Sequence, residues 1–432
     1  MAAACLAAAA SLAAPAALAD QWTLESNLQT ALEVNDNVSL VASPSGVTRT
    51  LSLTNSLLAA RNTENTSTKL DAALTALDQR GGDASNRIDG RLGLSYALTL
   101  PRGSVNLGAN LVQDFNSDVL SADVSVGRGR RRTLGLSASG SYAVSERLSA
   151  SVQGTLGRAG YGQEVTQAVD FRNESLSASA SYLLSEIDSV ALQANHTAYR
   201  TSSGSTRSRT DSLNAQYTRA LSERASASLS LGGFREDTER TFFARVCPLP
   251  VAFCASGVVA PSVVPVVVPS PRSGVDLGAS LSYRLDEASS LSASLGRRKS
   301  SAAFTMQFNE RDSLAVSAAR QVGPSGMGTE VRSQNFSIAG AFGITPTLNA
   351  SVNLAQSRAS SNDGSNLGTN AARQPLQTSL SAVLSKEFTR DASLQVALRR
   401  TQAQGLAGGA SASANSLSIA LRLTWARLDT AR

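Results

Sequence analysis

Residues 133–156, TLGLSASGSYAVSERLSASVQGTL, decide the fold of this chain. Apolar side chains occupy every second position from Leu134 to Val144, with Ser, Thr and Gly at most positions between them. This period of two is typical of a β-strand with one apolar face. After a polar turn at residues 145–147 the alternation resumes from Leu148 to Leu156. The stretch therefore predicts an antiparallel hairpin closed by a tight turn.

The composition favours a membrane barrel over a soluble domain. Aromatic residues make up 5% and charged residues 17% of the 432 positions, which is too little bulk for a conventional core and too little charge for a soluble surface. A water-filled barrel needs neither, because its apolar face meets lipid and its polar face meets water. Variants of the hairpin recur along most of the chain. We therefore expect an all-β transmembrane antiparallel barrel of roughly 18 to 20 strands, with short periplasmic turns and long extracellular loops.

The N-terminal segment predicts export. Residues 1–19 are nearly all Ala and Leu, and Ala17, Leu18 and Ala19 match the cleavage site of a signal peptide. The basic region that normally precedes such a segment is missing, and an intrinsic Ala-rich helix is the alternative. We expect a signal peptide at 1–19 and a barrel at 20–432, in the outer membrane of a Gram-negative bacterium. The barrel-assembly machinery and the outer-membrane lipids are then expected partners.

One segment breaks the pattern. Residues 235–273 contain half of the twelve prolines of the chain and the cysteines Cys247 and Cys254. Prolines at this density predict a large loop with polyproline character and not a central strand. In an exported protein the two cysteines predict a local disulfide, with free thiols as the alternative. A metal site is not expected, because no histidine lies near them.

Catalysis is poorly supported by the sequence. His196 is the only histidine, and no Ser/His/Asp or metal-ligand spacing surrounds it. It shares the parity of Leu192, so we expect it on the lipid side or near a rim. No catalytic residue, metal or cofactor is predicted. The basic residues are scattered and aromatic residues are few, so nucleic acid is not an expected partner either.

A channel is better supported. The parity opposite the apolar residues carries Ser, Thr, Asn, Gln and Gly, small polar groups that wet a channel without imposing strong charge selectivity. The candidate lumen-lining residues are Asn106, Asn110, Gln153, Arg298, Arg399 and Arg422. The three arginines would bias the lumen toward anions or an anionic polysaccharide. The alternative is that they only solvate the interior.

The densest basic cluster comprises Arg128, Arg130, Arg131 and Arg132, at a predicted loop-to-strand junction. One interpretation is a solvated loop rim. The other is a contact for the phosphates of lipopolysaccharide in the outer leaflet.

The segment LEVNDNVSL, residues 32–40, contains the signature Asp36, Asn37 and Val38 directly after the first predicted strand. It resembles the outer-membrane β-barrel proteins of exopolysaccharide-biosynthesis loci, including those of exosortase/PEP-CTERM systems. An aromatic residue often precedes the signature in that family, and Val34 replaces it here. The resemblance implies a barrel that passes a polysaccharide across the outer membrane, and no catalytic residues. A general porin and a structural or adhesive surface barrel without an open channel remain as alternatives.

Overall fold

The computed structural model of the protein describes residues 21–82, 86–115, 129–162, 169–246, 262–296, 299–324, 330–361, 376–404 and 410–429. These residues form one antiparallel sheet of 20 strands, within the predicted range. No helix among them is both long and apolar enough to cross a membrane. The predicted signal peptide at 1–19 lies outside the described residues.

In chain order the strands are β1 (Gln21–Asn35), β2 (Thr48–Asn62), β3 (Thr66–Arg80), β4 (Arg87–Leu100), β5 (Gly103–Phe115), β6 (Arg130–Ala143), β7 (Leu148–Tyr161), β8 (Phe171–Leu183), β9 (Asp188–Thr201), β10 (Thr206–Ser222), β11 (Ala225–Val246), β12 (Ser262–Arg284), β13 (Ser289–Gly296), β14 (Ser300–Gln307), β15 (Ser313–Pro324), β16 (Glu330–Thr345), β17 (Leu348–Ser361), β18 (Leu376–Thr389), β19 (Ala392–Gln404) and β20 (Ser411–Asp429).

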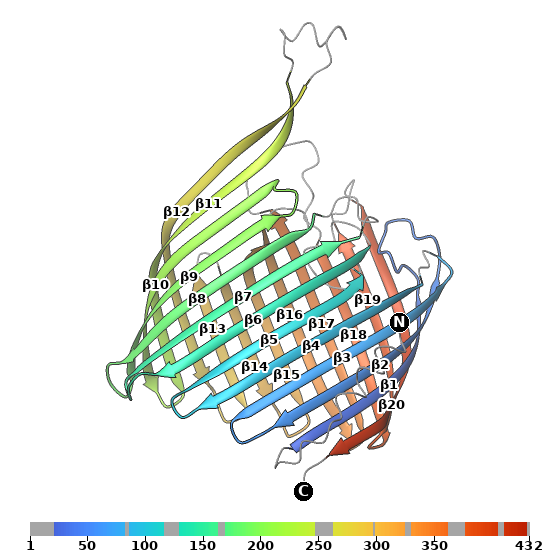
Figure 1. Ribbon diagram of the computed structural model, residues 1–432. Helices are drawn as coiled ribbons and strands as arrows, with labels where there is room; N and C mark the ends of the chain where they lie inside the picture. The colour runs from blue at the N-terminus through green and yellow to red at the C-terminus, as the bar shows by residue number, and fades with distance from the viewer. Residues whose placement is uncertain are drawn as a thin grey trace.

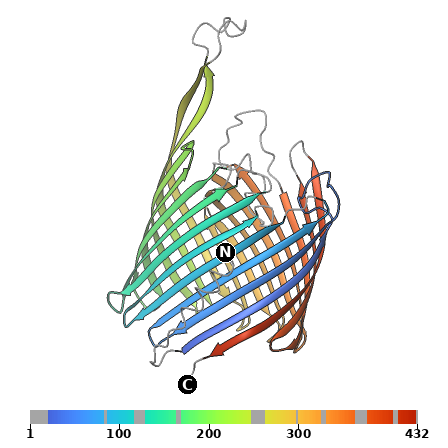
Figure 2. The same cartoon turned by 45° about the vertical axis from the view of Figure 1, so that its right-hand side comes forward.

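The sheet closes on itself into a barrel. Each strand pairs with its neighbour in sequence, and β1 pairs with both β2 and β20. In Figures 1 and 2 the first strand, in blue, and the last strand, in red, lie side by side at this seam. Closure removes the free edges of the ring itself, which is what a β-structure needs in lipid, where unpaired backbone groups have no water to bind.

The strand register places the apolar residues on one continuous face. Leu111, for example, lies opposite Leu92 on one side and Leu134 on the other. The leucines and valines of this parity are exposed along the whole ring, as expected of a belt that meets lipid. We call this face the outer face and the opposite one the inner face. Toward the short turns the outer face carries a girdle of aromatic residues, Tyr96, Tyr142, Tyr182, Tyr283, Phe342 and Trp425, typical of a membrane interface.

The short turns share one side-chain device. In the turn after β6, the backbone N–H groups of Arg147 and Leu148 donate to the Ser145 hydroxyl. In the turn after β8, Ile187 and Asp188 donate to Ser185 in the same way. A side-chain oxygen that bonds the backbone two and three residues ahead fixes a tight turn. The hairpin predicted from residues 133–156 is thus confirmed as β6 and β7.

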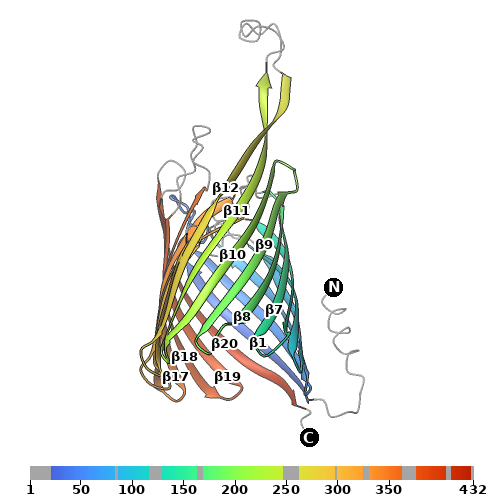
Figure 3. The same cartoon turned by 90° about the vertical axis from the view of Figure 1, so that its left-hand side faces the viewer.

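The prediction that residues 235–273 form a loop is wrong for the described residues at both ends of this segment. Residues 235–246 belong to β11 and residues 262–273 to β12, and the two strands pair without a register shift from Ala225 opposite Tyr283 to Val246 opposite Ser262. Beyond the rest of the wall this hairpin continues as a two-stranded extension (Figures 1 and 3). Cys247 and Cys254 lie outside the described residues, so their disulfide stays a prediction.

The prolines of β12 are compatible with a strand because their missing backbone N–H groups all lie on the same edge of that strand. The backbone N–H of Arg284 donates toward β11, to Arg224, whereas that of Leu285 donates toward β13, to Ser289. Along β12, odd-numbered residues therefore point their N–H position toward β13. Pro265, Pro269 and Pro271 are all odd, and β12 pairs with β13 only from Gly278 to Arg284. The missing donors thus face a free edge, where proline is tolerated.

The Asp36–Asn37 signature holds the extracellular end of the seam together. The Asp36 carboxylate accepts hydrogen bonds from the backbone N–H and the side-chain amide of Asn415, both at 2.7 Å. The Asn37 amide donates to the backbone oxygens of Ser413 at 2.9 Å and Val41 at 2.7 Å. These contacts tie the loop after β1 to the start of β20.

Candidate functional site

The inner face of the barrel carries ladders of hydroxyl groups. Cross-strand pairs of Ser and Thr lie within hydrogen-bond distance, such as Ser151 with Ser179 at 2.7 Å and Thr155 with Ser175 at 2.6 Å. Further pairs join Ser104 to Ser141, Ser228 to Ser280, Ser290 to Thr305 and Ser317 to Ser337. Because directly opposed residues share a face, these ladders make a polar wall that water wets.

Five of the six predicted lumen residues lie on this inner face. Asn106, Asn110, Gln153, Arg399 and Arg422 are exposed, and the register sets each of them on the parity opposite the apolar residues. Arg298 lies outside the described residues. The five do not form a cluster, since Arg399 is opposite Ser416 whereas Arg422 is opposite Ser393, at the other end of the same strand pair.

Inward charged side chains are most numerous on one side of the inner wall, with smaller groups on β5 and β6 (Asp114, Arg131) and on β11 and β12 (Glu236, Arg272, Asp276). Strands β19, β20 and β1 to β4 are contiguous through the seam, and we call them the charged sector. Among their described inward side chains are Glu25, Glu33, Lys69, Asp71, Arg87, Asp89, Arg91, Arg399 and Arg422. Both signs are present, and some are paired, as in the ion pair of 2.9 Å between Arg87 and Asp89.

A hydrogen-bond network lies at the seam within the charged sector. Asn27, only 7% exposed, accepts from Thr424 at 2.6 Å and from Arg422 at 3.4 Å, and donates to Glu25 at 2.9 Å. Arg422 and Glu25 are also 3.6 Å apart as an ion pair. The network sits where the β1–β20 register shifts between Ser26 and Asn27. Arg422 could be assigned to the inner face from the sequence, whereas its partners could not be identified, because they meet it only when the barrel closes.

The opposite side of the inner wall is neutral. Strands β13 to β17, which we call the neutral sector, carry Ser, Thr, Asn, Gln, Ala and Gly at their described inward positions in the membrane-spanning part. By ring order β13 and β14 lie across the lumen from β3 and β4. A solute inside the barrel would therefore meet mixed charge on one side and hydroxyl and amide groups on the other.

The inner face is covered at its extracellular end along β7 to β10. Tyr199 is 4%, Phe171 9% and Thr201 0% exposed. The rings of Phe171 and Tyr199 pack with their centroids 5.5 Å apart, and Tyr161 packs against them. Nearer the middle of the same wall, Ser151 and Gln153 are exposed. Inward side chains of this wall are thus accessible in its middle and buried near this part of the mouth.

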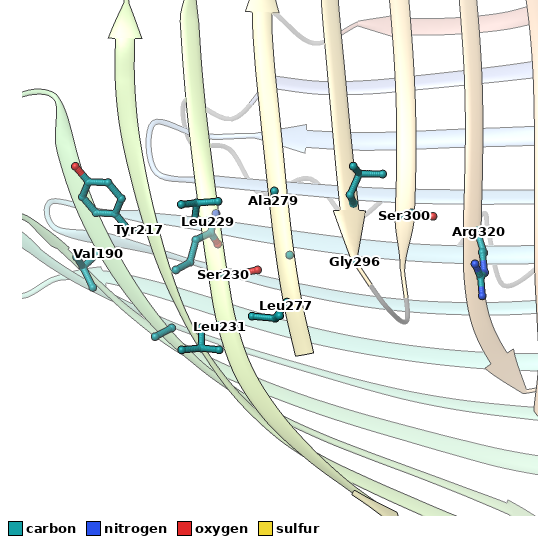
Figure 4. Close-up of a pocket in the computed structure, with 14 residues that line it drawn as sticks. Val190, Tyr217, Leu229, Ser230, Leu231, Leu277, Ala279, Gly296, Ser300 and Arg320 are labelled. Atoms are coloured by element: carbon teal, nitrogen blue, oxygen red, sulfur yellow. The ribbon is translucent and has the colours of Figure 1, made fainter. Parts of the chain in front are cut away.

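A depression of about 920 Å³ lies over β9 to β15 (Figure 4). Most of its lining side chains, including Leu229, Leu231 and Leu277, carry the outer parity. The depression therefore belongs to the lipid-facing surface and is not part of the lumen.

His196 lies on the outer face, as its parity predicted, opposite Leu176 and Asp211. Its Nδ1 is 2.6 Å from the Asp211 carboxylate, a contact that the sequence did not show. Asp211 also accepts from Arg209 at 2.9 Å. The described contacts of this pair include no Ser, Thr or Cys nucleophile. Within the described ranges no group of three or more His, Cys, Asp and Glu side chains is arranged to hold a metal ion.

Comparison with solved structures identifies the architecture. The crystal structure of the ferric-catecholate import receptor Fiu from E. coli K12 in its open form matches with a TM-score of 0.51 and 10% identity, over 92% of this chain and 82% of that chain. Its closed form matches with a TM-score of 0.50, also at 10% identity, over 93% and 82%. Pseudomonas aeruginosa OpdL matches with a TM-score of 0.36 and 12% identity, over 95% and 99%.

The chain has the fold of a bacterial outer-membrane barrel. The apolar outer belt and its aromatic girdle agree with a position in the outer membrane. No family model matches the sequence, and no curated protein matches it. At 10% identity the likeness to the receptor establishes the fold alone.

Proposed function

We propose that this outer-membrane barrel is a channel for hydrophilic solutes. The observation that carries the proposal is the inner wall, where hydroxyl ladders run around the ring and are accessible in their middle. Barrels of 16 to 18 strands leave an aqueous channel, whereas those of 22 hold a plug in the lumen. A ring of 20 strands encloses at least the width that porins use for water and small solutes.

We further propose that the solute is a polysaccharide on its way out of the cell. Sugars are recognised through their hydroxyl groups, and the hydroxyl and amide side chains of the neutral sector can form hydrogen bonds with them. Because this sector carries no fixed charge, it would not hold a passing polymer tightly. Arg399 and Lys69, exposed on the charged sector, would attract an acidic polymer. The resemblance of the Asp36–Asn37 signature to barrels of exopolysaccharide loci supports this solute class.

Two experiments test separately whether the barrel is a channel and whether its solute is a polysaccharide. Planar-bilayer recording of the purified, folded protein tests the channel, and a folded protein without conductance would refute it. Deleting the gene and measuring secreted polymer tests the solute. Unchanged secretion, together with normal conductance, would reject polysaccharide export and leave a porin.

A plugged surface barrel is the second candidate. It is favoured by the covered inner face near Tyr199 and Thr201, and by the extension of β11 and β12 beyond the wall (Figure 3). In that case the extension would be the functional part and the lumen would not conduct. A variant that lacks residues 241–267 distinguishes the two, because a channel keeps its conductance and a surface barrel loses its adhesion.

A further inference from the structure

Four arginines lie directly opposite one another on the outer face of four consecutive strands. Arg158 on β7 pairs with Arg172 on β8, Arg172 with Arg200 on β9, and Arg200 with Arg207 on β10. We call them the arginine row. All four are exposed, and Figure 3 faces the part of the wall that carries them. Like charges directly opposite each other destabilise a sheet, and here three such pairs follow in succession.

The arginine row is only partly neutralised by the protein. Arg172 forms an ion pair of 2.8 Å with Glu174, and Glu239 on β11 faces Arg207 in the register. Among the described residues Arg158, Arg200 and Arg207 form no ion pair. With strands about 4.8 Å apart, the four guanidinium groups span roughly 14 Å of surface. The row thus presents a line of positive charge that needs an external anion.

The height of the row in the membrane identifies that anion. Tyr182, in the aromatic girdle, and Arg172 are ten residues apart on β8. Ten residues correspond to about 33 Å of strand, or about 25 Å along the membrane normal at a tilt near 40°. This equals the height of the apolar band of such barrels. Since the girdle marks the periplasmic interface, the row lies at the head-group level of the outer leaflet.

The surface just below the row is suited to acyl chains. A depression of about 630 Å³ runs over Leu176, Ala194 and Leu213, which lie closer to the girdle than the arginines do, and its lining includes the polar His196, Asp211 and Arg235 between these apolar residues and the row. Phosphate above and hydrocarbon below is the arrangement of a phosphorylated lipid. Arginine binds phosphate through two parallel hydrogen bonds, which makes it suited to such head groups.

We propose that the arginine row binds the phosphate groups of the outer-leaflet glycolipid, lipopolysaccharide. The basic cluster first singled out in the sequence contributes less. Arg131 points to the inner face and pairs with Asp114 at 2.8 and 3.0 Å, and Arg128 lies outside the described residues. Arg130 and Arg132 remain exposed on the outer parity above the row. The proposal does not depend on whether the lumen conducts.

The test measures binding of labelled, purified lipopolysaccharide to the full-length protein in detergent. The variant R158Q/R172Q/R200Q/R207Q should raise the dissociation constant at least about tenfold, while the corresponding four-lysine variant should retain most of the affinity. A matched control is R320Q/R358Q. These two outer-face arginines on β15 and β17 are separated in the register by Gln334, and their loss should leave binding unchanged.

Three outcomes would overturn the proposal. The first is an unchanged dissociation constant in the four-glutamine variant, or an equal loss in the control. The second is equally tight binding of lipopolysaccharide from which the phosphates have been removed. The third is displacement of the lipid by low millimolar inorganic phosphate, which would reveal a free-phosphate site. If the four-glutamine variant fails to show the heat-modifiable gel mobility of a folded barrel, R158Q/R172Q and R200Q/R207Q are tested separately, each with about a threefold loss expected.

Discussion

The charged sector and the neutral sector of the inner wall share the same alternation of apolar and polar residues, but their inward side chains interact in different ways. In the neutral sector, Ser317 and Ser337 face each other at 2.7 Å and both are reached by water, so neither depends on the other. In the charged sector, Asn27 is buried among Glu25, Arg422 and Thr424. The comparison shows that alternation alone builds a wall, whereas the closing strands need specific partners.

The largest effect is expected at the seam. The substitution Asn27→Ala removes three side-chain hydrogen bonds at the seam, two of them with the charged groups of Glu25 and Arg422, which costs about 1–3 kcal/mol. Urea unfolding in detergent micelles measures the change in the free energy of unfolding. A loss no greater than that of Ser317→Ala would contradict the distinction between the sectors.

Charge reversal in the charged sector should change ion selectivity. Lys69 and Arg399 are inward and exposed, so K69E/R399E should favour cations by about threefold over wild type at low salt, where screening is weak. Reversal potentials across a salt gradient measure this preference. The control S317A/S337A changes polarity in the neutral sector without changing charge, and it should leave the reversal potential where it is.

A single ladder hydroxyl should matter little. Ser317→Ala removes one exposed hydrogen bond to Ser337, and water replaces the lost partner, so the expected cost is at most about 0.5 kcal/mol. The same unfolding experiment measures it. A cost above that of Asn27→Ala would show that the ladders, and not the seam, hold the barrel together.

The smallest effect is expected from a periplasmic turn next to the neutral sector. The backbone N–H of Gly343, at 2.8 Å, and the side-chain amide of Asn309 lower the pKa of the Asp312 carboxyl below 3.8. A carboxyl group whose pKa is depressed in the folded protein stabilises the folded state at any pH above the pKa of the unfolded chain. This stabilisation is lost as the pH falls through the pKa of the folded protein. Wild type should therefore have a higher melting midpoint than Asp312→Asn at pH 6, and the difference should be smaller at pH 3. An equal difference at both values would disprove the assignment.

Much of the barrel could be predicted from the sequence, because a strand with one lipid-facing side has an apolar residue at every second position. The hairpin β6–β7, the strand range and the parity of His196 were all visible in this way. The error at 235–273 has a local cause. Proline density argues against a strand, and only the position of Pro265, Pro269 and Pro271 on one parity, beside a free edge, makes them compatible with β12.

The features that define the site could not be predicted, because they depend on register between strands. Arg158, Arg172, Arg200 and Arg207 are scattered in sequence and become a row only when four strands align. Asn27 and Arg422 lie at opposite ends of the chain and meet through barrel closure. Alternation assigns each residue to a face, but it does not determine which residues on that face are neighbours.

We propose that the hydroxyl-lined lumen is an open path for hydrophilic solutes. The most direct test is the single-channel current of the purified protein in a planar bilayer, with folding verified by heat-modifiable gel mobility. An open lumen should give stable current steps at low voltage that persist when residues 241–267 of the β11–β12 extension are deleted. A correctly folded protein that inserts into the bilayer and passes no current, with or without the extension, would contradict it.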